Sequence, residues 1–76
     1  MHRAKELTIR ELEIMQLLAE GLTKPKIATK LGIEESTVKS HVENIYRKTG
    51  FHDKLQLVIW ALLAGLVTSN IVIKKD

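Results

Sequence analysis

Apolar side chains recur every three or four positions in the first part of the chain. They stand at Leu12, Ile14, Met15, Leu17, Leu18 and Ala19. This spacing is the period of an amphipathic helix. Thr8 and Glu11 have the separation of a capping box, in which each side chain bonds the backbone N–H of the other residue, and Gly21 is a typical helix end. The pattern predicts a helix over residues 9–20, with Glu11 as a capping or internal salt-bridge residue.

Two further helical patterns follow, separated by a glycine turn. In the first of them Pro25 stands in the first turn, where its missing N–H costs nothing, and Gly32 ends a helix predicted over residues 24–30. The apolar face of the second comprises Val38, Val42, Ile45 and Tyr46. Its polar face comprises Lys39, Ser40, Glu43, Asn44 and Arg47. We expect this helix over residues 36–49, with a start one residue earlier as the alternative.

A fourth helix is expected over residues 54–64, and it carries no charge after Lys54. Its side chains form two neighbouring faces. One face comprises Leu57, Val58, Ala61 and Leu62, and the other comprises Gln56, Ile59, Trp60 and Leu63. Because one helix cannot bury both faces in so small a domain, the second face predicts an interface. The alternative is that Trp60 closes the core beneath the tail.

The chain shows no pattern of a sheet or of a membrane span. No segment alternates with period two for long enough to form a strand, and the β-like run at 71–73 is too short for a sheet. The apolar run that begins at Leu57 is interrupted at Thr68, well short of the ~20 residues that cross a bilayer. Since the start of the chain is charged and lacks a signal-peptide core, we expect an all-α, four-helix domain in the cytoplasm.

The composition excludes several classes of function. The 76-residue chain is long enough for one domain and has no cysteine, which excludes disulfides and thiolate chemistry. It shows no nucleophile–base pair, no carboxylate pair and no glycine-rich phosphate loop, and its three histidines lack ligand spacing. We therefore expect no enzyme, no metal and no cofactor. The formal net charge is +3, and the segment 24–54, with seven basic and four acidic residues, carries the same excess, which suits a polyanionic partner.

The helices expected at 24–30 and 36–49, with the glycine turn between them, have the order of a helix-turn-helix. In that motif the second helix enters the major groove of DNA, which is about 12 Å wide and takes one α-helix. The short first helix then crosses the DNA backbone, and the polar face of the second supplies groups for base edges. Short helix pairs around a glycine also occur in proteins that never contact DNA, so the motif alone is not sufficient.

A larger set of residues resembles a known family. It comprises Leu7-Thr8, Arg10-Glu11, Glu13-Ile14, Gly21, Ile27-Ala28, Leu31, Ile33, Thr37-Val38-Lys39, His41-Val42, Ile45, Lys48, Gly50, Gln56 and Gly65-Leu66-Val67. In this order they are similar to the LuxR/GerE-type helix-turn-helix domain, the output domain of NarL/FixJ-type response regulators. The resemblance covers residues 7–67, which leaves 1–6 as an N-terminal arm or linker and 68–76 as a C-terminal tail.

The resemblance implies a transcription regulator that binds double-stranded DNA as a homodimer, with RNA polymerase as a further candidate partner. The third helix would recognise DNA and the fourth would supply the dimer contact. Base-facing positions are Lys39, Ser40 and Glu43. Phosphate-facing positions are Lys24, Lys26, Thr37, Asn44, Arg47 and Lys48. The dimer interface is expected at Gln56, Ile59, Trp60 and Leu63.

Some positions depart from the family pattern or admit a second interpretation. Glu34 stands where Ser or Thr usually caps the third helix, so we expect that cap to shift to Ser36 or to weaken. Glu43 and Arg47 lie one turn apart and are also spaced for an ion pair. The competing hypothesis is an interaction module whose basic face and fourth helix bind a protein. A salt titration of DNA binding separates the two hypotheses.

Overall fold

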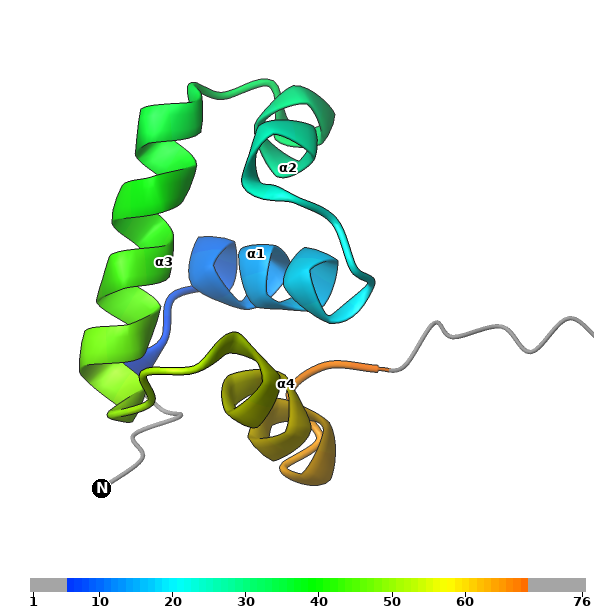
Figure 1. Cartoon of the computed structure of the whole chain (residues 1–76), viewed down its shortest axis with the longest axis vertical. Coiled ribbons are helices and arrows are strands. Elements are labelled where there is room, and N and C mark those ends of the chain that lie inside the picture. The colour runs from blue at the N-terminus through cyan, green and yellow to red at the C-terminus, as the bar shows by residue number, and fades with distance from the viewer. Residues whose placement is uncertain (1–5, 69–76) are drawn as a thin grey trace, which may run out of the picture.

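The structure, a computed structural model, describes residues 6–68 as four packed helices. They are α1 (Ile9–Ala19), α2 (Lys24–Leu31), α3 (Glu35–Thr49) and α4 (Lys54–Leu63). Figure 1 shows α3 along one side of the molecule, with α1 between α2 and α4. No strand is present between residues 6 and 68, and the all-α, four-helix prediction is confirmed.

The helix boundaries agree with the sequence pattern to within one residue. α1 ends at Ala19 and α4 at Leu63, each one residue earlier than expected. α2 includes Leu31, because the residue that ends it in a left-handed conformation is Gly32, with φ of 69°. α3 begins at Glu35, the alternative start. The predicted arm at 1–6 and tail at 68–76 lie almost entirely outside the described residues.

The helices begin with different caps. At α1 the Thr8 hydroxyl accepts from the Glu11 N–H at 3.1 Å, and the Glu11 carboxylate accepts from the Thr8 N–H at 2.9 Å. This reciprocal pair confirms the capping box. At α4 the Asp53 carboxylate accepts from the Leu55 N–H at 3.2 Å. Glu34 is the N-cap of α3 and makes no side-chain cap bond, so the expected weakening of that cap is confirmed.

All four helices contribute to one apolar core. Its fully buried large side chains include Ile14, Met15, Ile27, Val38, Ile45 and Leu57. Each large side chain of this kind contributes roughly 1.5–3 kcal/mol when it leaves water. Since Val38 and Ile45 turn one side of α3 into this core, the opposite side of α3 faces outward.

A buried carboxylate joins α1 to the last turn of α3. The ammonium of Lys48 lies 2.8 Å from Oε1 and 3.1 Å from Oε2 of Glu11, whose side chain is only 3% exposed. Burial acts to raise the pKa of Glu11, but hydrogen bonds from Lys48 and Thr8 and the charge of Lys48 outweigh it and lower the pKa below its ordinary value. Glu11 is therefore both the cap and the internal salt-bridge residue that its position predicts.

Candidate nucleic-acid interface

The polar side chains of α3 form one outward face. Lys39, Ser40 and Glu43 are all exposed, whereas Val38 and Val42 on the opposite face are at most 3% exposed. The buried face holds α3 against α1 and α2, so the three polar side chains project from a fixed helix. α3 has 15 residues and is therefore about 22 Å long. With a diameter of about 10–12 Å, such a helix fits the major groove of DNA.

Lys39 has a charged neighbour on its own helix. Its Nζ lies 3.6 Å from Oε2 of Glu35, and the two side chains are 57% and 45% exposed. Exposed ion pairs of this kind contribute about 0–1 kcal/mol. The ammonium of Lys39 can therefore leave Glu35 for a better acceptor at little cost.

Further along α3, the guanidinium of Arg47 donates to Oδ1 of Asn44 at 2.7 Å. Between residues 6 and 68 no ion pair joins Arg47 to Glu43, so the alternative pairing of those two residues is not formed. A guanidinium has five N–H donors, and the bond to Asn44 uses one of them. Arg47 is exposed, and its other donors remain able to reach a phosphate.

The remaining candidates for phosphate contacts fall into two groups. Lys24, Lys26 and Thr37 stand in the first turns of α2 and α3, and of these Lys26 and Thr37 are exposed while Lys24 is half-buried. Free backbone N–H groups and the helix dipole make such positions favourable for phosphate. Lys48 differs, because its ammonium is bound to Glu11 and its side chain is only 23% exposed.

α4 exposes an apolar stripe. Leu55, Ile59 and Leu63 are 65%, 47% and 85% exposed and stand four residues apart, so they share one side of the helix. Trp60 is half-buried against the core, and its ring centroid lies 5.5 Å from that of Phe51. Sequence reasoning missed Leu55 as a member of the exposed face, although its four-residue spacing from Ile59 was the available signal.

An apolar groove lies beside this stripe. Its apolar lining comprises Leu18 and Ala19 of α1 and Leu55, Val58, Ile59 and Leu62 of α4, and Asp53 and Lys54 at the start of α4 are its charged members. Gln56, the polar member of the predicted interface, is also exposed.

Across residues 6–68, no three His, Asp or Glu side chains are grouped so that they could hold a metal ion. Nor does that part of the chain contain a helix of the length and apolarity that crossing a membrane requires.

Comparison with known proteins gives the family. Residues 5–61 match the bacterial regulatory proteins of the luxR family. The chain belongs to the LuxR family. The transcriptional regulatory protein YxjL of Bacillus subtilis is 45% identical to this LuxR-family chain over 64 residues, which are 84% of the chain and 29% of YxjL. The nitrate/nitrite response regulator NarL of Escherichia coli is 40% identical over 55 residues, which are 72% of the chain and 26% of NarL.

A solved structure supports the same assignment. The response regulator ChrA, from a heme-sensing two-component system, superposes on the LuxR-family chain with a TM-score of 0.74 at 40% identity. The match covers 79% of this chain and 30% of ChrA. The chain spans less than a third of the length of YxjL, NarL or ChrA. It is thus a DNA-binding transcription-regulator domain of a non-enzymatic family, and it matches the output domains of response regulators.

Proposed function

We propose that this LuxR-family domain places α3 in the major groove of a specific DNA half-site, with Lys39, Ser40 and Glu43 facing the bases. The observation that carries the proposal is the division of α3 into a buried apolar face and an exposed polar face. A helix packed in this way can enter a groove without uncovering any core side chain.

The three base-facing residues have complementary chemistry. Lys39 can donate to O6 and N7 of guanine, Ser40 can contact either kind of base pair, and Glu43 can accept from N4 of cytosine. A carboxylate close to DNA phosphates is repelled, so Glu43 adds discrimination between sequences rather than affinity.

Phosphate contacts would then hold α3 in register. We assign them to the exposed or half-exposed polar groups around α3 and at the start of α2. They are Lys24, Lys26, Thr37, Asn44 and Arg47. Lys48 was a sixth candidate from the sequence, but it would have to leave Glu11 to reach a phosphate. We therefore assign Lys48 to holding α3 in place.

The domain is further proposed to work as a homodimer through α4, in the cytoplasm, where bacterial DNA lies. The exposed stripe of Leu55, Ile59 and Leu63 supports this, because a second copy would remove these side chains from water. Gln56 lies exposed on the same helix. Trp60 would contribute at the edge of the interface, because its side chain is half-buried and packs on Phe51.

Selection of bound fragments from random DNA tests the proposal. We expect one enriched half-site, repeated at a spacing of about one helical turn if the domain dimerises. Affinity for that site should fall steeply with salt, because Lys and Arg side chains release counterions from the phosphates. If no DNA sequence is enriched and DNA affinity does not change with salt, the result would favour the competing hypothesis of a protein-interaction module.

A further inference from the structure

The chain reverses its direction directly after α4. Gly65 lies in the left-handed region, with φ of 76°. Its N–H donates to the Leu62 carbonyl at 3.1 Å, and the Leu66 N–H donates to the Ala61 carbonyl at 2.9 Å. These two bonds form the Schellman motif of a helix end. The turn directs the following residues back toward α1 (Figure 1), where Val67 is only 5% exposed and belongs to the core.

Next to Val67, the side-chain amide of Gln16 binds the backbone of Thr68. Nε2 of Gln16 donates to the Thr68 carbonyl at 2.9 Å, and the Thr68 N–H donates to Oε1 of Gln16 at 2.8 Å. Nε2 also donates to Oε2 of Glu20 at 2.9 Å. Because Nε2 faces two acceptors and Oε1 faces a donor, only one orientation of the amide satisfies all three bonds. We call this group of bonds the Gln16–Thr68 clasp.

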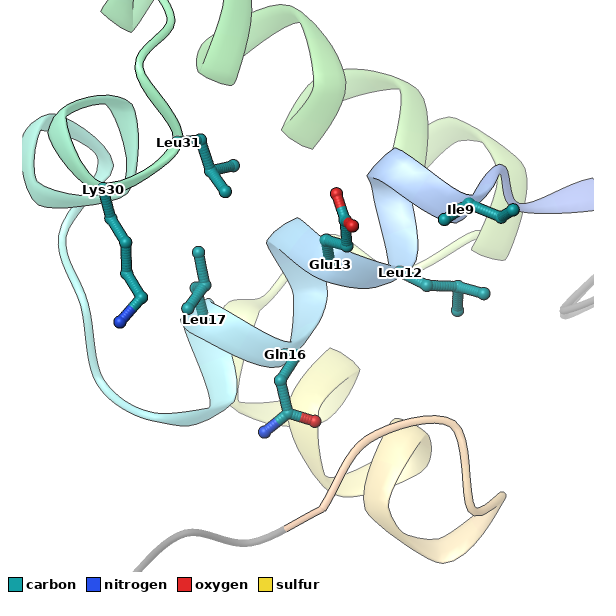
Figure 2. A pocket seen from close by; sticks show the side chains of 7 residues that line it. All are labelled: Ile9, Leu12, Glu13, Gln16, Leu17, Lys30 and Leu31. Atoms are coloured by element: carbon teal, nitrogen blue, oxygen red, sulfur yellow. The ribbon is translucent and has the colours of Figure 1, made fainter.

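The clasp lies apart from the face of α3 that we propose to contact DNA. Gln16 stands at the border of a shallow groove that α1 forms with α2, lined also by Leu17 and Leu31 and by no residue of α3. Figure 2 shows that its side chain extends from α1 toward the segment that follows α4. The clasp therefore joins α1 to the end of α4 and leaves α3 untouched.

The other attachment of α4 is apolar. Within residues 6–68 the helix packs mainly on α1, and its buried side chains are Leu57 and Ala61. Burial of apolar surface is non-directional, and packed helices can slide past one another by small amounts. Hydrogen bonds weaken steeply when their geometry changes. The clasp therefore adds a directional restraint on the position of α4 along α1.

The surface that we propose for the dimer contains both helices. The groove beside the exposed stripe of α4 has Leu18 and Ala19 of α1 on one side and Leu55 and Ile59 of α4 on the other. A second copy that covers this surface contacts α1 and α4 together. Since an interface requires complementary shapes, a shift of α4 against α1 would reduce its fit to the second copy.

We propose that Gln16 is a positioning residue for self-association, because the clasp holds α4 on α1 in the arrangement that a second copy recognises. The proposal rests on the homodimer through α4. Without the clasp, the stripe keeps its side chains but α4 occupies more positions, and affinity falls with the fraction in the correct one. For such exposed bonds this corresponds to about threefold per copy. Because both copies lose the clasp, the dimer dissociation constant should rise about tenfold.

Gln16→Met in the full 76-residue chain tests the proposal. Methionine is of similar length and suits a helix, but it has no amide to donate to the Thr68 carbonyl. We expect sedimentation equilibrium to give a dimer dissociation constant about tenfold higher than that of the native chain. Lys30→Met is the matched control, since it places the same side chain at the border of the same groove and keeps the clasp. It should change the constant by less than about twofold.

Binding to a single DNA half-site separates positioning from a general loss of structure. At protein concentrations where the chain is monomeric, Gln16→Met should bind the half-site within about twofold of the native affinity, because α3 and its packing are unchanged. If half-site affinity falls as much as self-association does, Gln16 supports the whole fold and the proposal is wrong.

The outcomes distinguish the clasp from the dimer on which it rests. If Gln16→Met leaves self-association unchanged while serine at both Ile59 and Leu63 weakens it, the clasp proposal fails and the α4 dimer stands. If neither change weakens self-association, the α4 dimer fails, and the clasp proposal fails with it. Equal weakening by Gln16→Met and Lys30→Met would also overturn the clasp proposal, because Lys30 takes no part in the clasp.

Discussion

Lys48 and Glu11 stand 37 positions apart in the chain, yet the ammonium of Lys48 lies 2.8 Å from the carboxylate of Glu11. The same carboxylate caps α1 through Thr8. One side chain thus fixes the start of α1 and the end of α3 relative to each other. The pair adds a polar contact to the apolar packing that orients the proposed DNA-binding face, although neither residue belongs to that face.

Glu11→Gln should lower the free energy of unfolding by about 2 kcal/mol, because it leaves Lys48 half-buried without an anionic partner. Glu13→Gln is the matched control. Its carboxylate is 53% exposed and lies 3.3 Å from the guanidinium of Arg10, and loss of such a pair should change stability by less than about 0.5 kcal/mol. Denaturant titrations of the three proteins measure the difference. Similar losses in both variants would show that the buried pair has no special role.

The contribution of Glu11 should also depend on pH. Its pKa is lowered in the folded protein, so its ionised form stabilises the fold at pH values above the ordinary glutamate pKa of about 4.3. That stabilisation is lost as the pH falls below this value and through the lowered pKa. The stability difference between the native protein and Glu11→Gln should therefore be constant near pH 7 and shrink on acidification. A difference that grows at low pH would contradict the assigned direction.

Lys39→Ala should weaken binding to the selected half-site by about 1–3 kcal/mol and relax the choice of base at one position. The reason is that Lys39 is exposed on α3 and leaves only a weak surface pair with Glu35. Competition between the half-site and its single-base variants measures the effect. If specific and random DNA lose affinity equally, Lys39 contacts a phosphate instead.

Lys26 and Lys48 should respond differently to salt. Removing one phosphate contact lowers the slope of log affinity against log salt by about 0.9. Lys26→Ala should have this effect, because Lys26 is exposed at the start of α2. Lys48→Ala should keep the slope of the folded domain and lower its stability instead, because its ammonium is bound to Glu11. Binding measured at several salt concentrations, together with thermal melting, distinguishes the two outcomes.

Replacing both Ile59 and Leu63 by serine should weaken self-association at least about 100-fold, since the two side chains contribute about 3 kcal/mol per copy when buried and both copies lose them. The fold should survive, because both side chains are exposed in the single domain. Trp60→Ala should mainly lower stability, by about 3 kcal/mol, because Trp60 packs against Phe51 and the core. Sedimentation equilibrium and thermal melting report the two quantities. Unchanged association in the double variant would refute the α4 dimer.

Local sequence signals predicted most of the fold, but they could not predict contacts between residues that are far apart in the chain. The capping box of Thr8 and Glu11 lies within one turn, so its spacing was sufficient. The bond from Lys48 to Glu11 joins residues from different helices, and no periodicity specifies it. On α4 the pattern showed more apolar surface than one core can bury. Which side turned inward was decided by packing against α1, and this placed Trp60 toward the core and Leu55 on the surface.

The bond between Gln16 and Thr68 has a consequence for the order of folding. It joins residues 52 positions apart, and closing a loop of that length costs about 3.5 kcal/mol of chain entropy. Two hydrogen bonds, at about 1 kcal/mol each, cannot offset that cost alone. The bond can therefore form only after packing of α1 on α4 has brought the two segments together. Amide exchange at Thr68 would follow the last step of folding and the first step of unfolding.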